Sequence, residues 1–199
     1  MLLSEIHHRV KNNMQVVSSL LQLQASKSND RQVIGILEDS RNRIQSMAMI
    51  HDKLYRLEDF TQIDFTKYVQ DLSHSLFRAY DVDPGKVTFK SDIEEIPIKL
   101  DCAIPCGLII NELVTNSLKH AFPKSGAGEI RVALHAISGD EAMFSVSDNG
   151  IGLPKDSDYK NTRSLGLHLV TILAENQLEG EIELDRTGGT KFSIRFKIN

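Results

Sequence analysis

The chain is poor in the residues that cross-link or interrupt a fold. It has 2 cysteines, 5 prolines and 12 glycines in 199 residues. Two cysteines cannot build the disulfide framework of a small secreted scaffold, and they suit a reducing compartment. The proline and glycine contents are too low for a collagen-like or low-complexity linker protein.

Long apolar runs are also missing. None reaches the roughly 18 to 20 residues that a membrane-spanning helix needs, and the first residues, MLLSEIHHRVKNN, lack the apolar core of a signal peptide. We therefore expect a cytoplasmic protein whose own residues make no membrane contact.

The chain has no excess of positive charge. Its formal net charge is -4, which argues against nucleic acid as a partner, because broad binding to phosphates needs a surplus of Lys and Arg. Hydrophobic residues make up 41% and charged residues 25%. These values are typical of a globular protein, and the length suits one large domain or two small ones.

Apolar residues recur at helical spacing in the first part of the chain. One stripe comprises Ile6, Val10, Met14, Val17 and Leu21; a second comprises Val33, Leu37, Ile44, Met47 and Leu54. A polar break at 26–31 separates them, which predicts an antiparallel hairpin of two helices, the second over about 32–57. Because two helices alone bury little surface, we expect a homodimer in which two hairpins form a four-helix bundle.

The rest of the chain mixes helices with short strands. We predict helices at 64–80, 101–122 and 165–176, and strands at 86–91, 129–137, 141–148, 181–185 and 191–197. The strands come in hairpin pairs without a regular alternation of strand and helix, so an α+β sandwich is the expected class. We divide the chain into domains at 1–60 and 61–199, with a hinge near 58–64.

Two adjacent histidines lie on the first predicted helix. His7 shares a face with the apolar stripe, so we expect a packing role for it. His8 shares a polar face with Glu5 and Asn12, and a neutral imidazole there can act as a nucleophile near pH 7. Glu5, one turn earlier, could orient the ring and accept its proton. From the helix alone, a solvated surface histidine is the commoner alternative.

The helix predicted at 101–122 carries polar residues within an apolar run. They are Asn111, Glu112, Asn116, Lys119 and His120. The pair at 112 and 116 shares one face, and a carboxylate, an amide oxygen and a cation in line suit Mg²⁺ and phosphates. A polar face that meets solvent is the alternative.

Three glycine-containing motifs follow this helix. D-N-G-I-G-L-P spans 148–154, S-L-G-L-H-L spans 164–169, and G-G-T-K-F spans 188–192. The first places a carboxylate where it could accept a hydrogen bond from an amine. The second places Gly166 at a helix start, which favours phosphate. Singly, each motif could equally be an ordinary turn.

Together, in this order and spacing, the motifs resemble those of the GHKL (Bergerat-fold) ATP-binding domain, which histidine kinases share with gyrase-type ATPases. The resemblance covers about 64–199. The segment E-I-H-H-R-V-K-N-N resembles the dimerisation and phosphoacceptor hairpin of a histidine kinase subfamily marked by H-R-V-K-N. The resemblance implies an antiparallel helical hairpin followed by an α/β sandwich of the GHKL ATPase type.

The resemblance also implies site residues. His8 is the phosphorylated residue, and Asn116 holds Mg²⁺ against the phosphates of ATP. The other implied nucleotide contacts are Asn111 and Glu112 beside the metal site, Lys119 and His120 near the phosphates, Asp148 on the adenine amine, Gly150 and Gly152 around the base, Gly166 and Leu167 at a phosphate-binding helix start, and Thr190 at the adenine edge.

Departures from the family pattern concern the base and the lid. Arg9 follows His8, where the commonest histidine kinases have an acidic residue. This makes Glu5 the candidate base, with Arg9 in an electrostatic role toward the phosphate. The lid between 148 and 166 is short. Asn12, one turn after His8, could position a water for dephosphorylation of a partner.

The resemblance implies an ATP-dependent autokinase that phosphorylates His8 and passes the group to an aspartate of a response regulator receiver domain. The alternative is a regulatory GHKL ATP-binding module, or a serine kinase, without histidine phosphorylation. Cys102 and Cys106 are four residues apart. We interpret them as small packing residues and not as a metal pair.

Overall fold

The structure is a computed structural model that describes residues 2–55, 64–83, 85–123, 126–154, 159 and 165–198, without the side chains of 2–8, 46 and 49–55. The chain forms two compact units, Met1–Phe60 and Thr61–Asn199.

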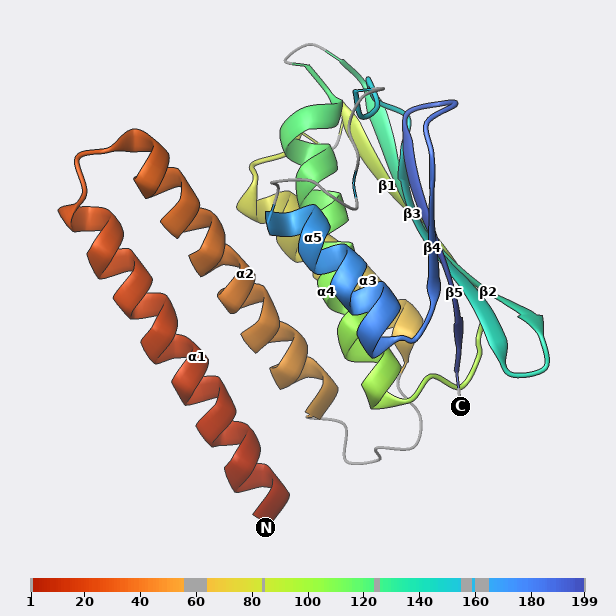
Figure 1. The fold of residues 1–199 in the computed structure, drawn as a ribbon, viewed down its shortest axis with the longest axis horizontal. Coiled ribbons are helices and arrows are strands. Elements are labelled where there is room, and N and C mark those ends of the chain that lie inside the picture. Colours follow the sequence, from red (N-terminus) through yellow and green to blue (C-terminus); the bar gives the residue numbers. More distant parts are fainter. Residues whose placement is uncertain are drawn as a thin grey trace. The chain divides into compact units, whose positions relative to one another are not determined.

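The first unit is a hairpin of two long helices, α1 (Leu2–Lys27) and α2 (Arg31–Tyr55), which run antiparallel (Figure 1). Asp30 in the short connection begins α2, because its carboxylate accepts a hydrogen bond from the Gln32 N–H at 2.8 Å. The predicted hairpin is confirmed.

The second unit contains a five-stranded sheet. Its strands are β1 (Val87–Ile93), β2 (Gly128–Ser138), β3 (Glu141–Asp148), β4 (Glu181–Asp185) and β5 (Thr190–Lys197), in the order β1-β2-β3-β5-β4. The pairs β2–β3 and β4–β5 are antiparallel hairpins, as predicted. The expectation that all strands come in hairpins is wrong for β1, which pairs parallel to β2. A parallel neighbour needs a long crossover, and α4 (Leu100–Asn116) supplies it.

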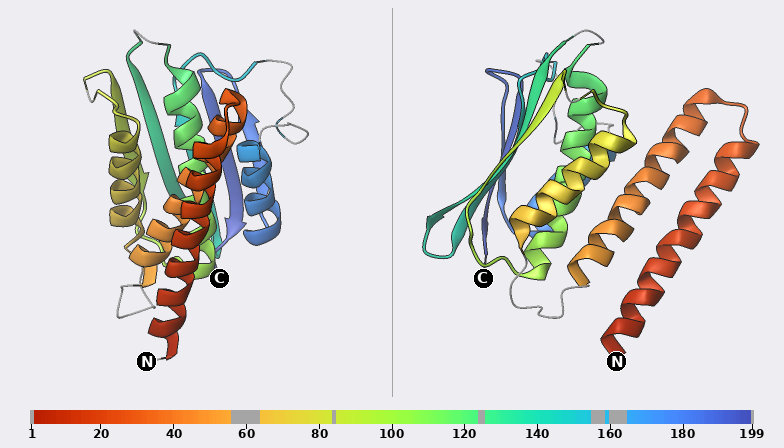
Figure 2. Two further views of the ribbon diagram at one scale, coloured as in Figure 1. Left: turned by 90° about the vertical axis from the view of Figure 1, so that its left-hand side faces the viewer. Right: turned by 180° about the vertical axis from the view of Figure 1, so that it is seen from behind.

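Three helices cover one face of this sheet: α3 (Phe65–Ala79), α4 and α5 (Leu165–Ile172) (Figures 1 and 2). The core lies between these layers. Along β3 the side chains alternate between buried and half-buried, and Phe144 and Val146 point inward. They meet α4, which buries Ile109, Ile110 and Val114.

Both α4 and α5 end in a π-helical turn. The first, η1, spans Ser117–Ala121 and the second, η2, spans Leu173–Gln177. The single helices expected at 101–122 and 165–176 are therefore each composed of an α-helical part and a terminal π turn. Turns of the π type are rare in proteins overall, but those that occur are frequently at functional sites. Three residues of η1, Ser117, His120 and Ala121, line a pocket.

Candidate functional site: a pocket between α4, β3 and β5

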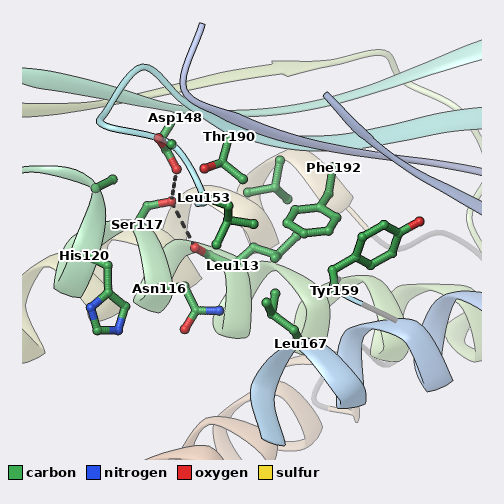
Figure 3. A pocket seen from close by; sticks show the side chains of 13 residues that line it. Leu113, Asn116, Ser117, His120, Asp148, Leu153, Tyr159, Leu167, Thr190 and Phe192 are labelled. Carbon is green, nitrogen blue, oxygen red and sulfur yellow. Dashed lines mark hydrogen bonds between the residues drawn. The ribbon is translucent and has the colours of Figure 1, made fainter. Parts of the chain in front are cut away.

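A cavity of about 240 Å³ opens between the end of α4, η1, β3, β5 and the start of α5 (Figure 3). Six of the residues singled out in the sequence line it: Asn116, His120, Asp148, Gly152, Leu167 and Thr190. They come from elements that are far apart in the sequence, so the fold brings the separate motifs to one place.

Asp148 ends β3 and is only 8% exposed. The Ser117 hydroxyl, on η1, donates a hydrogen bond to its Oδ2 at 2.7 Å, and the Gly150 N–H donates to its Oδ1 at 3.0 Å. A carboxylate offers about four lone-pair sites, so both oxygens retain capacity toward the cavity. Ser117 was not among the predicted site residues; its position directly after Asn116 was the available signal.

Glycines let the backbone pack closely around Asp148. A Cβ on Gly150 would lie 2.3 Å from the Ala121 carbonyl oxygen, and one on Gly189 would lie 2.1 Å from the Asp148 carbonyl oxygen. Gly152 and Gly189 also have positive φ angles of 74° and 120°, which favour glycine. These contacts bring the D-N-G-I-G and G-G-T motifs together at one end of the cavity.

The other walls are apolar. Phe192 on β5 packs edge-on against Tyr159, with ring centroids 5.5 Å apart and planes at 82°. The Tyr159 hydroxyl donates to the Ile182 carbonyl at 3.1 Å, which fixes its ring beside the cavity (Figure 3). Leu153 and Leu167 complete these walls. Neither aromatic residue was predicted: Tyr159 lies outside the motifs, and in G-G-T-K-F, which ends at Phe192, only Thr190 was assigned a role.

Asn116 and His120 lie together at one side of the cavity, away from Tyr159 and Phe192 (Figure 3). No cluster of three His, Cys, Asp or Glu side chains suited to a metal occurs among the described residues. At this side of the cavity Asn116 contributes an amide oxygen, a kind of ligand that Mg²⁺ accepts. The Asn116 amide oxygen beside a site for phosphates fits Mg²⁺, which is commonly held by one or two protein oxygens with water and substrate phosphates.

Five predicted residues do not line the cavity. Asn111 and Glu112 are buried in α4, 5% and 3% exposed, and the Asn111 Oδ1 has no hydrogen-bond partner within the described part of the chain. Lys119 is exposed, with its Nζ 5.8 Å from the centroid of the Tyr80 ring. Gly150 borders the cavity through its contact with Asp148, and Gly166 is buried at the start of α5.

The predicted phosphoacceptor lies on the other unit. The backbone of α1 is helical at His8 and Glu5, whose side chains lie outside the described residues. The described members of the predicted polar face are all exposed; they are Asn12, Gln15, Ser19 and Gln22. No described helix has the length and apolar character needed to cross a bilayer.

Cys106 is fully buried and Cys102 is partly buried, next to the Lys197 carbonyl. Burial raises the pKa of both thiols. A raised pKa keeps a thiol protonated, whereas metal ligation requires the thiolate.

The chain matches two family models. One, described as histidine kinase, matches residues 5–80. The other, described as histidine kinase-, DNA gyrase B-, and HSP90-like ATPase, matches residues 103–199.

Two curated relatives match almost the whole chain. Sensor histidine kinase PdtaS of Mycobacterium tuberculosis is 31% identical over 198 residues, which are 98% of this chain and 39% of that protein. Blue-light-activated histidine kinase 2 of Erythrobacter litoralis is 26% identical over 201 residues, 98% of this chain and 56% of that protein. The chain thus spans about two fifths to just over half of these relatives.

Solved structures share the fold. The blue-light-activated histidine kinase EL346 of Erythrobacter litoralis aligns with 98% of this chain and 58% of its own, at a TM-score of 0.74 and 23% identity. The histidine kinase AdeS of Acinetobacter baumannii aligns with 96% of this chain and 98% of its own, at a TM-score of 0.59 and 16% identity.

Proposed function

Because this chain carries a histidine kinase catalytic core, we propose that it transfers the γ-phosphate of ATP to its own His8. The observation that carries this proposal is the cavity in which a buried, hydrogen-bonded Asp148 faces apolar walls while Asn116 and His120 lie at the other side. This cavity offers one place for a base and another for phosphates.

Adenine fits the end of the cavity at Asp148. Its exocyclic amine can donate to the Asp148 carboxylate, which Ser117 and the Gly150 N–H hold in place. Thr190 is the residue paired with Asp148 across β3 and β5, so its hydroxyl lies beside the same edge of the base. The side chains of Leu153 and Phe192 exclude water from the ring faces, where burial of apolar surface stabilises binding by about 25 cal/mol per Å².

The phosphates extend toward Asn116 and His120. The Asn116 amide oxygen would hold Mg²⁺, and the ion would offset the negative charge on the phosphates and on departing ADP. His120 lies at the same side of the cavity and can donate a hydrogen bond to a phosphate oxygen. Leu167 lines the cavity and Gly166 precedes it in the first turn of α5, whose backbone N–H groups would donate to a phosphate oxygen.

In the transfer step the unprotonated ring nitrogen of His8 attacks the γ-phosphorus in line. The N–P bond forms as the bond from phosphorus to the bridging oxygen of ADP breaks, and the electron pair leaves with ADP. Glu5, one helical turn earlier, accepts the proton from the other ring nitrogen. The hinge predicted near 58–64 would bring His8 to the nucleotide; of its residues, only Asp64 lies in the described part of the chain.

A homodimer suits the surface of the hairpin. Large apolar side chains are exposed on both helices, among them Val16 at 58%, Leu20 at 55% and Ile36 at 56%. Burying each such side chain fully is worth about 1.5–3 kcal/mol, so pairing two hairpins into a four-helix bundle removes this surface from water.

The phosphohistidine then donates its group to an aspartate on the receiver domain of a response regulator in the cytoplasm. Asn12 lies on the exposed polar face of α1, one turn after His8. It is placed to orient a water against the phosphorylated partner, which would give the chain a phosphatase activity.

Incubation of the full chain with γ-labelled ATP tests the proposal. We expect label that is lost in acid, that His8→Gln abolishes and that the matched control His7→Gln retains. Label that is stable in acid would instead identify a serine kinase. Nucleotide binding without any label would identify a regulatory ATP-binding module.

A further inference from the structure

A second cavity, of about 760 Å³, lies between α3 and the edge strand β1. Its main lining residues are Ser73, Phe77, Arg78, Val82, Val87 and Phe89. None of them lines the nucleotide pocket. We call this cavity the α3–β1 groove. It lies at the edge of the sheet, where α3 and β1 run beside each other (Figure 2).

The floor of the groove is apolar and well defined. Phe77 and Phe89 pack edge-on, with ring centroids 6.1 Å apart and planes at 73°. The turn after α3 closes one end: the Val82 N–H donates to the Phe77 carbonyl at 3.0 Å, and Asp81 takes a positive φ of 49°. This is a Schellman ending, which sets the residue after the turn against the last helical turn.

One polar group beside the groove has no partner. Ser73 is 0% exposed, and its hydroxyl has no hydrogen-bond partner among the described residues. At 0% exposure this hydroxyl is closed off from the groove, so we assign it no contact with a bound segment.

The edge of β1 offers a ladder of backbone groups. In a parallel pair, alternate residues direct their N–H and C=O groups toward the neighbouring strand. The Gly128 N–H donates to the Lys86 carbonyl and the Glu94 N–H donates to the Leu134 carbonyl, so the even-numbered residues of β1 face β2. Phe89 and Ser91 therefore direct their backbone N–H and C=O groups to the outer edge of the sheet. No other strand pairs with that edge in the described part of the chain.

The rim of the groove carries one positive and one negative side chain, Arg78 and Asp81. Arg78 is exposed and forms no ion pair with the described residues, and exposed His74 lies one turn before it on α3. The acidic residue of the rim, Asp81, lies in the closing turn. An acidic side chain beside α3 would complement the charge of Arg78.

We propose that the α3–β1 groove binds an extended segment of a partner protein as an additional strand on β1. The segment's backbone pairs with Phe89 and Ser91. An apolar side chain enters over Phe77 and Phe89, and an acidic side chain on the same face meets Arg78. Such strand addition takes its affinity from main-chain hydrogen bonds and its specificity from pockets for alternate side chains.

A synthetic peptide of alternating threonine and valine, with one phenylalanine and a glutamate two positions later, tests the proposal on the full chain. We expect binding by fluorescence anisotropy, together with slowed amide exchange at Phe89 and Ser91. Arg78→Glu should weaken binding roughly tenfold and favour the peptide with lysine in place of glutamate. Lys67→Glu is the matched control, because it reverses the charge of an exposed residue of α3 that does not line the groove. It should leave binding unchanged.

Backbone pairing is tested separately. A peptide N-methylated on the paired edge, and the variant Ser91→Pro, which an edge strand tolerates, should each weaken binding at least roughly tenfold. Absence of binding by wild type up to about 1 mM peptide, or equal binding of the N-methylated peptide, would overturn the proposal. Autophosphorylation should persist in Arg78→Glu, so failure here is distinguishable from failure of the kinase assignment.

Discussion

At the scale of single residues, the nucleotide pocket depends on the Asp148 carboxylate and on glycines whose backbone packs closely around it. Asp148 is held by Ser117 and by the Gly150 N–H, and its own carbonyl lies against Gly189. Asp148, the glycines and Thr190 could be predicted from local motifs. Tyr159 could not, because its place in the pocket arises from contacts with Ile182 and Phe192. Ser117 and Phe192 lie next to or within the motifs, but only the fold brings them to the pocket.

Asp148→Asn should weaken binding of an ATP analogue by roughly ten- to a hundredfold, because the amide presents a donor where the adenine amine needs an acceptor. Isothermal titration with a non-hydrolysable analogue measures this. Glu183→Gln, at an exposed position on β4, is the matched control and should bind as wild type does. An unchanged affinity of Asp148→Asn for the analogue would contradict the proposed contact between adenine and Asp148.

Gly189→Ala should lower the free energy of unfolding by about 2–4 kcal/mol, since the methyl group would meet the Asp148 carbonyl at a strained φ. The neighbouring Gly188→Ala is a sharp control, because nothing lies within 4 Å of a Cβ there. Urea denaturation compares the two variants. Equal stabilities would contradict the close packing described for the G-G-T turn.

At the scale of elements, helical and strand periodicity predicted most boundaries to within a few residues. Periodicity could not predict the π turns, because one extra residue in a turn leaves the apolar pattern almost unchanged. Nor could it predict that β1 runs parallel to β2, since pairing across a helical crossover depends on how α4 packs. The apolar pattern also does not predict the positive φ angles of Asp81 and Glu179, which lie just after helical segments.

Glu179 follows η2 with a positive φ of 49° and is exposed. The Gly180 N–H donates to the Ala174 carbonyl at 2.9 Å across this turn, so the left-handed conformation is required. Glu179→Gly should therefore raise the free energy of unfolding by about 0.5–1 kcal/mol, measured by thermal denaturation. Glu179→Ala keeps the strain and should gain much less; a larger gain with alanine would contradict this explanation.

At the scale of the whole molecule, buried ionisable groups give stability a pH dependence. Burial raises the pKa of both Tyr68 and Cys106 in the folded state. As the pH rises, these two groups therefore lose their protons in the unfolded chain before they do so in the folded one. The free energy of unfolding is at its full value below the ordinary thiol pKa of about 8.5 and declines as the pH rises beyond it.

Denaturation midpoints between pH 7 and about pH 10 should fall progressively in wild type. Tyr68→Phe with Cys106→Ala should flatten the decline. The tyrosine change should cost little, because the described residues offer its buried hydroxyl no hydrogen-bond partner. A decline that is unchanged in the double variant would assign the pH dependence to other groups.

Assembly is a further property of the whole molecule. Leu20→Glu with Ile36→Glu, which charge the exposed apolar surface of the hairpin, should shift the protein from dimer to monomer in analytical ultracentrifugation. Ile151→Glu, an equally apolar exposed site in the other unit, should leave the dimer intact. A monomeric wild type would contradict the four-helix bundle.

Mass spectrometry under neutral conditions, after incubation with ATP and Mg²⁺, shows whether the chain carries phosphate on His8, because phosphohistidine survives there and its position can be read from fragments. We expect phosphate on His8 in wild type and in His7→Gln, and none in His8→Gln. Phosphate on His7 or on a serine, or phosphate that persists in His8→Gln, would contradict the proposed transfer to His8.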